Sequence, residues 1–261
     1  MLQEQGITNW KTFVASSRAF FDAHLGSPMY QLIETMDELY HIAYLKGSFP
    51  KTGREEDDLI HMCFLICHRA LLSAATCTGN GQPEDAPAIT RRAFEAAKTV
   101  LALKADPANF QVWKAIEIRK GRWEARAQSV KPKGMVNLQY KGLDAEPLYE
   151  KLQDVIGTLS DSTVHFTLEH VLAYKWEQTP RQDGGADTTF GVDRDRIVKD
   201  FLLLADQHRL IHDVFDRCLD GKLLGHPEVN QVAKRAMNLF RGLLRREGFI
   251  REATTLEGEN W

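Results

Sequence analysis

Residues 55–75 read EEDDLIHMCFLICHRALLSAA, and this stretch decides the fold class. Its four leading acids suit the first turn of a helix, where the helix macrodipole favours negative charge. Residues 59–75 are apolar on nearly every side of a helix, a pattern typical of a helix at the centre of a bundle. His61, His68 and Arg69 interrupt the run, which also falls short of about twenty clean apolar residues. We therefore expect a core helix rather than a membrane span.

Helical signals continue on both sides of this stretch. Ser27-Pro28, for example, is a cap followed by proline at the first helical position, and apolar residues then recur at spacings of three and four. We predict further helices over residues 8–24, 27–46, 87–104, 107–116, 148–159, 161–177, 193–219 and 227–246. The sequence thus predicts an all-α fold, a multi-helix bundle of about eight to ten helices in a single domain spanning residues 1–261.

Two segments interrupt the helical pattern. Four prolines and glycines between residues 128 and 147 predict a hinge, and residues 178–193 are expected to form one long loop. Strand is expected for only a few residues, around 135–140 or 188–192.

Composition limits the class of protein. The chain has 261 residues, 43% hydrophobic and 26% charged, which excludes a disordered or fibrous chain. A net charge of −3 excludes a globally basic nucleic-acid coat, although it allows a local basic patch. The four cysteines form no secreted framework, and MLQEQGITNW lacks the pattern of a signal peptide. We expect a soluble, cytoplasmic protein, with no membrane partner.

Familiar catalytic and cofactor motifs are missing from the sequence. It contains no P-loop, no GxGxxG fingerprint, no GxSxG elbow and no HExxH. These absences remove the most easily recognised enzyme classes, and we predict no cofactor.

The strongest candidate for a polar site combines two predicted helices. Arg91 and Glu95 lie four residues apart, with Arg92 beside them, and Ser162 and His165 lie three apart on a later helix. Small and apolar residues surround Glu95, so we expect it to be buried and to pair with Arg91 or His165. Breaking such a buried network would cost roughly 3–5 kcal/mol. The pattern fits a phosphate site or a proton-transfer site, but a structural network that joins two helices explains it equally simply.

At these residues the chain resembles an uncharacterised, mainly prokaryotic, all-helical family known only as a domain of unknown function. The resemblance rests on TRRAFEAAKTVLAL at 90–103 and LSDSTVHFTLEH at 159–170, and it covers about residues 55–220. It implies a helical fold and a bacterial source, and it singles out the same Arg, Glu, Ser and His residues. It implies no reaction.

Histidine and acid spacing suggests a metal site, but we predict none. His208, His212 and Asp216 follow one another at intervals of four. With nine histidines and 36 acidic residues in the chain, short pairings of this kind are expected by chance. Cys63 and Cys67, also four apart, are interpreted as buried thiols.

A basic stretch over residues 114–133 is the third candidate. It holds seven Lys or Arg residues against two Glu, and two tryptophans accompany it. Cations interleaved with aromatic rings suit single-stranded nucleic acid, although a solvated helix face gives the same pattern. The candidate patch consists of Trp113, Arg119, Lys120, Arg122, Trp123 and Arg126. Arg241, Arg245, Arg246 and Arg251 would extend the patch if they lay nearby, but the sequence does not place them.

Two classes of function remain open. The leading hypothesis is a non-enzymatic binding or regulatory module, in a stress or defence system, whose partner is RNA or a phosphate-bearing ligand. The alternative is a helical-bundle hydrolase, either metal-dependent through His208, His212 and Asp216 or RNase-like through His165. A homodimer is compatible with either reading.

Overall fold

The protein is an all-α bundle, as the helical spacing predicts. The computed structural model describes residues 15, 19, 22, 23, 26–47, 49, 50, 53–80, 85–115, 140–164, 174–180, 186–192 and 194–250. The long helices of this part are α2 (Gly26–Lys46), α3 (Glu55–Gly79), α4 (Ala86–Ala105), α6 (Tyr149–Val164), α8 (Arg194–Cys218) and α9 (Pro227–Arg246).

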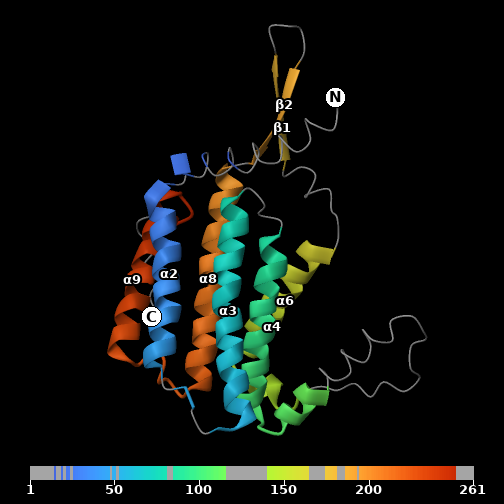
Figure 1. Ribbon diagram of the computed structural model, residues 1–261, viewed down its shortest axis with the longest axis vertical. Coiled ribbons are helices and arrows are strands. Elements are labelled where there is room, and N and C mark those ends of the chain that lie inside the picture. Colours follow the sequence, from blue (N-terminus) through green and yellow to red (C-terminus); the bar gives the residue numbers. More distant parts are fainter. Residues whose placement is uncertain are drawn as a thin grey trace, which may run out of the picture.

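The helices lie side by side and nearly parallel to one axis of the molecule (Figure 1). Helices α3 and α8 occupy the middle and contact each other, with α4 packed against both. Helix α9 packs on α2 at one edge, and α6 packs on α4 at the opposite edge. The outer surfaces of α9 and α6 therefore form the two ends of the row.

Local sequence signals account for where these helices begin and end. Four acids, Glu55 to Asp58, lie in the first turn of α3, as the macrodipole favours. Proline occupies the first turn of both α4 and α9, where its missing N–H costs no helical hydrogen bond. Gly47 follows α2, and a Cβ there would lie 2.3 Å from the carbonyl oxygen of Ala43, so the close approach at this helix end requires glycine.

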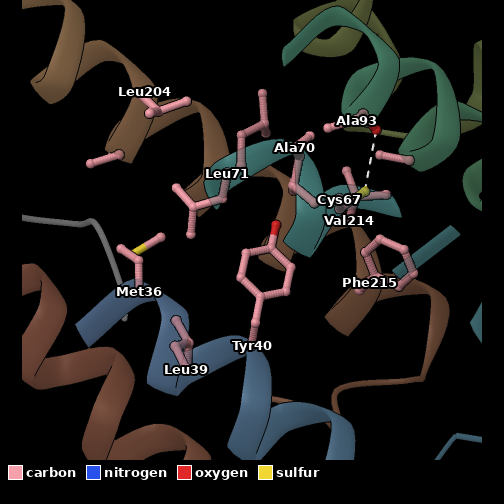
Figure 2. Close-up of a cluster of buried hydrophobic side chains, with 14 of the residues drawn as sticks. Met36, Leu39, Tyr40, Cys67, Ala70, Leu71, Ala93, Leu204, Val214 and Phe215 are labelled. Atoms are coloured by element: carbon pink, nitrogen blue, oxygen red, sulfur yellow. Dashed lines mark hydrogen bonds between the residues drawn. The ribbon is translucent and has the colours of Figure 1, made fainter. Parts of the chain in front are cut away.

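The core forms where α2, α3, α4 and α8 meet. Tyr40, Phe64 and Phe215 are fully buried, and the ring centroid of Phe64 lies 5.1 Å from that of Tyr40 and 5.0 Å from that of Phe215. Figure 2 shows Tyr40 projecting from α2 toward Cys67 and Leu71 of α3. The inner face of helix α3 thus lies in the core, as predicted from residues 59–75. The expectation that this helix is covered on nearly every side is wrong, because Met62, Leu65 and Leu72 are exposed on its outer face.

A two-stranded antiparallel hairpin, β1 (Tyr174–Pro180) and β2 (Ala186–Val192), projects beyond the bundle (Figure 1). The predictions of a helix reaching residue 177 and of one long loop over 178–193 are therefore wrong. The physical reason is that both segments carry β-branched and aromatic residues, such as Trp176 opposite Phe190 in the register. The expected strand around 188–192 lies within β2, whereas residues 135–139 lie outside the described residues.

Other boundaries differ from the expectations. Helix α6 runs without a break to Val164, so the predicted division near residue 160 is wrong. The described part contains seven helices, including the short 3-10 helix η1 (Leu143–Ala145), against the eight to ten predicted. The predicted hinge lies outside the described residues up to 139, and its described end contains η1. Most of the predicted helix over 8–24 also lies outside them, and the single domain stays a prediction.

Candidate functional site

Arg91 and Glu95 form the predicted pair on α4. Arg91 Nε donates to Glu95 Oε1 at 3.1 Å, across one helical turn. The prediction that Glu95 is buried is wrong, because 52% of its side chain is exposed while Phe94 and Ala96 beside it turn inward. An exposed pair of this kind stabilises a protein by no more than about 1 kcal/mol. Glu95→Ala should therefore lower the free energy of unfolding by about 1 kcal/mol or less, and not by the roughly 3–5 kcal/mol expected for a buried network.

The helices that carry the two halves of this predicted site are neighbours. Helices α4 and α6 run antiparallel (Figure 1), and Lys98 Nζ lies 5.5 Å from the ring centroid of Tyr149. Arg92 is exposed on α4, and Ser162 belongs to the last turn of α6. The side chain of Ser162 and all of His165 lie outside the described residues, so their contact with Arg91 or Glu95 stays a prediction.

Little of the predicted basic patch over residues 114–133 falls in the described part of the chain. The Trp113 ring stacks on that of Phe110, with centroids 5.9 Å apart, and Lys114 pairs with Glu55 while its Nζ lies over the Phe110 ring. The residues outside the described ranges are Arg119, Lys120, Arg122, Trp123 and Arg126. The patch as a whole therefore stays untested.

The three residues considered as metal ligands on α8 have separate roles. Asp216 Oδ1 accepts a hydrogen bond from the backbone N–H of Leu224 at 2.7 Å and so holds the turn after α8. His208 and His212 are fully buried in the bundle. Among the described residues, no three His, Cys, Asp or Glu side chains converge as metal ligands would. Purification without a stoichiometric metal remains a prediction.

The two α8 histidines belong to a group that we call the His–Tyr cluster, formed by the buried Tyr40, His208 and His212 and the partly exposed His68. Tyr40 Oη lies 2.7 Å from Nδ1 of His208, and the Tyr40 ring stacks on that of His68 at 5.0 Å. His212 Nδ1 lies 2.8 Å from the carbonyl oxygen of His208, to which it must donate. Nε2 of His68, at the edge of the cluster, lies 2.5 Å from Oδ1 of Asp37. The cluster therefore joins α2 to α8 through the buried Tyr40–His208 contact. It joins α2 to α3 through the stacked rings of Tyr40 and His68 and through the partly exposed His68–Asp37 contact.

Burial sets the protonation of this cluster. It raises the pKa of Tyr40 well above its ordinary value, and the nearby Cys67 raises it further. Burial also lowers the pKa of His208 well below its ordinary value, and the nearby His212 and His68 lower it further. Burial lowers the pKa of His212 to about 4, although its hydrogen bond to the carbonyl oxygen of His208 acts in the opposite direction. Both imidazoles are therefore neutral at pH 7, and the Tyr40 hydroxyl donates to Nδ1 of His208.

The Tyr40 hydroxyl can be tested by removing it alone. Tyr40→Phe keeps the ring contacts with Phe64 and His212 but leaves Nδ1 of the buried His208 without its donor. Leaving a buried acceptor without its hydrogen-bond donor lowers the stability of a protein by about 1–3 kcal/mol. We expect a loss of this size in the free energy of unfolding measured with urea. Tyr44→Phe, on the exposed side of α2, is the matched control and should change it by less than about 0.5 kcal/mol.

The thiols of Cys63 and Cys67 on α3 are buried, as predicted. Burial raises the pKa of Cys63 to about 12, and it raises that of Cys67 well above its ordinary value. The Cys67 thiol donates to the carbonyl oxygen of Ala93 at 3.3 Å, a contact shown in Figure 2. Because the thiolate is the reactive form, these two residues serve packing rather than chemistry.

Helix α9 carries a row of polar and cationic side chains that we call the basic stripe: Lys234, Asn238, Arg241 and Arg245. Their spacings of four, three and four residues place them on one narrow face of the helix. Val229, Val232 and Ala236 are buried on the opposite side, where α9 packs on α2. The basic stripe thus lies on the side of α9 opposite its packed face. Helix α9 itself lies at the edge of the row of helices (Figure 1).

The charge of α9 is concentrated and only partly neutralised. The helix holds five Lys or Arg residues and a single acid, Glu228, in a chain whose net charge is −3. Glu228 pairs with Lys46, and Arg235 pairs with Glu38 of α2. Within the described part of the chain, the three cations of the basic stripe have no acidic partner within ion-pair distance. Lys234 and Arg245 are exposed, whereas Arg241 is half-buried and its buried Nε has no hydrogen-bond partner.

An aromatic ring lies just beyond the end of the basic stripe. Phe249 follows α9 and is 42% exposed, and its backbone N–H bonds to the carbonyl oxygen of Leu244 at 2.9 Å. Sequence reasoning considered Arg241, Arg245 and Arg246 only as additions to the patch over 114–133. The signal that identifies the stripe is the spacing of cations along α9 opposite its apolar residues.

A scan of protein-family models and searches of curated proteins and of solved structures found no match to this chain. The resemblance to a domain-of-unknown-function family therefore stays a prediction.

Proposed function

We propose that the protein is a non-enzymatic module that binds single-stranded RNA through the basic stripe of α9 and Phe249. The observation that carries this proposal is the set of three cations on one outward face with no acidic partner among the described residues. Uncompensated cations in a row attract a phosphate backbone, and their contacts release counterions.

The chemistry of the stripe favours a nucleic acid over an isolated phosphate. Lys234 and Arg245 are eleven residues apart, which is about 16 Å along a helix and long enough to contact several phosphates. The guanidinium groups of Arg241 and Arg245 suit bidentate contacts with phosphate oxygens. The exposed ring of Phe249 offers a surface on which an unpaired base can stack. Single-stranded RNA presents both phosphates and free bases.

The free thiols support a site of action in the cytoplasm. All four cysteines are unpaired, which suits a reducing compartment. The binding proposal requires no catalytic residue, whereas the hydrolase alternative requires one, such as His165.

The proposal is tested by removing the three charges together. In Lys234→Gln, Arg241→Gln, Arg245→Gln we expect the affinity for a labelled single-stranded RNA, followed by fluorescence anisotropy, to fall by roughly tenfold or more because three phosphate contacts are lost. The matched control is Lys151→Gln, Lys199→Gln, Lys222→Gln, three exposed lysines on other elements that give the same change in net charge.

Comparing the two triple variants distinguishes a specific RNA-binding site on α9 from general electrostatic attraction between the RNA and the protein. Equal weakening in both would overturn the proposal, as would unchanged binding by the α9 variant. Shortening of the RNA during incubation, measured on a gel with and without a chelator, would favour the hydrolase alternative.

A further inference from the structure

Helix α3 presents a second row of side chains to the surface, which we call the α3 outer stripe. Its members are Asp58, Met62, Leu65, Arg69, Leu72 and Thr76. All six are exposed, with Met62 at 60%, although α3 is otherwise a core helix whose Phe64 and Leu71 are buried. Ile66, 42% exposed, lies beside the stripe.

The spacing within the α3 outer stripe is that of a helix-pairing seam. Successive members are four, three, four, three and four residues apart, which keeps them on one line when two helices wrap around each other. Large apolar side chains gathered on one exposed face are unusual for a surface without a partner. The pattern therefore suits a second helix lying along α3.

The charges of the stripe indicate which helix that is. The acid Asp58 lies near the start of α3 and the cation Arg69 lies eleven residues later, with Met62 and Leu65 between them. The part of the stripe from Asp58 to Arg69 is acidic at one end, apolar in the middle and basic at the other, so it is complementary to itself when reversed. Leu72 and Thr76 extend the stripe beyond this self-complementary part.

We propose that two copies of this chain associate through α3, packed antiparallel about a two-fold axis between Met62 and Leu65. Asp58 of each copy then lies opposite Arg69 of the other, and Met62 lies opposite Leu65. The alternating spacing of four and three assigns the members in turn to the two core positions of a heptad, a and d. Each proposed pair joins an a position to a d position, as antiparallel helices require. Parallel pairing would instead oppose Asp58 to Asp58 and Arg69 to Arg69, which is repulsive.

A lipid bilayer is the other environment that α3 suggests. Within the described residues it is the one helix long and apolar enough to span a membrane, with a mean hydropathy of 1.5 over the best window. Its inner face packs in the core against α4 and α8, however, and its outer face includes the charges of Asp58 and Arg69. A second copy neutralises these charges, whereas hydrocarbon does not.

The test is a charge swap measured by analytical ultracentrifugation of the full chain. We expect a dimer for the unmodified protein at about 100 µM, which is within reach of a modest interface. Asp58→Lys and Arg69→Glu should each weaken association by roughly tenfold, because each places like charges opposite one another in two symmetric contacts. The double variant reverses both charges and should restore association to within about twofold of the unmodified protein.

Controls keep the outcome interpretable. Leu203→Glu, at an exposed position on α8, should leave association unchanged, and circular dichroism should show equal helix content in all variants. A monomeric unmodified protein, or a double variant as weak as the singles, would overturn the proposal. Flotation of the protein with anionic phospholipid vesicles in place of dimerisation would assign the face to a membrane and overturn it as well. RNA binding through α9 does not depend on this result.

Discussion

Phe64→Ala is expected to lower the free energy of unfolding by about 3–5 kcal/mol, the range observed when a fully buried aromatic ring is removed. Phe64 is 1% exposed, and its ring contacts those of Tyr40, Phe49 and Phe215, so several elements lose packing at once. The melting temperature should fall by roughly 10 °C, from about 2–4 °C per kcal/mol for a chain of this size. Thermal melting followed by circular dichroism measures this loss.

Two further variants show whether packing is the cause. Phe64→Leu retains most of the buried volume and should cost clearly less than Phe64→Ala. Leu203→Ala removes a side chain that is 52% exposed and should change the free energy of unfolding by less than about 0.5 kcal/mol. Similar losses in all three variants would contradict the position of Phe64 at the centre of the core.

Acid is expected to destabilise the protein through His212. Its pKa is lowered from 6.5 to about 4 in the folded state, so the unfolded chain binds a proton at a higher pH than the folded one does. The contribution of His212 to the free energy of unfolding therefore does not change with pH above about pH 7. It is lost as the pH falls from 6.5 to about 4. The shift corresponds to about 3 kcal/mol across that window. His208, whose pKa is also lowered, adds a loss of the same sign.

The test compares urea unfolding at pH 7.5 and pH 4.5. His212→Asn retains an amide that can donate to the carbonyl oxygen of His208 but removes the titrating ring. This variant should be less stable at neutral pH, and its loss of stability on acidification should be smaller than that of the unmodified protein. His41→Asn, at an exposed position on α2, should lose as much as the unmodified protein. An unchanged acid response in His212→Asn would contradict a neutral, buried His212.

The parts of the fold that could be predicted are those with one dominant local signal. Residues 55–75 combine four acids with a long apolar run, and they form α3 with its inner face in the core. Of the hairpin β1–β2, only the strand around residues 188–192 could be predicted. Strand β1 could not, because apolar residues at helical spacing up to residue 177 compete with β-branched and aromatic residues in the same segment. A strand forms only when two segments meet in space, and the spacing of residues within one segment does not indicate which segment it will meet.

The candidate sites were predictable to a smaller extent. Arg91 and Glu95 pair because residues four apart share a helix face, but which face turns inward depends on the neighbouring helices, and Glu95 is on the outer one. The same limit applies to His208, whose partner Tyr40 lies 168 positions away in the sequence. The basic stripe differs, because its spacing opposite apolar residues within α9 could be recognised from the sequence alone.

The most direct measurement of the proposed RNA interface is the salt dependence of binding. Affinity for a single-stranded RNA is measured at several salt concentrations for the unmodified protein and for Lys234→Gln, Arg241→Gln, Arg245→Gln. Each phosphate neutralised on a single strand contributes about 0.7 to the slope of log affinity against log salt. If the basic stripe holds the RNA backbone, the slope of the variant should be less steep by about 2. Equal slopes for the two proteins would show that these three cations do not contact the RNA and would contradict the proposed function.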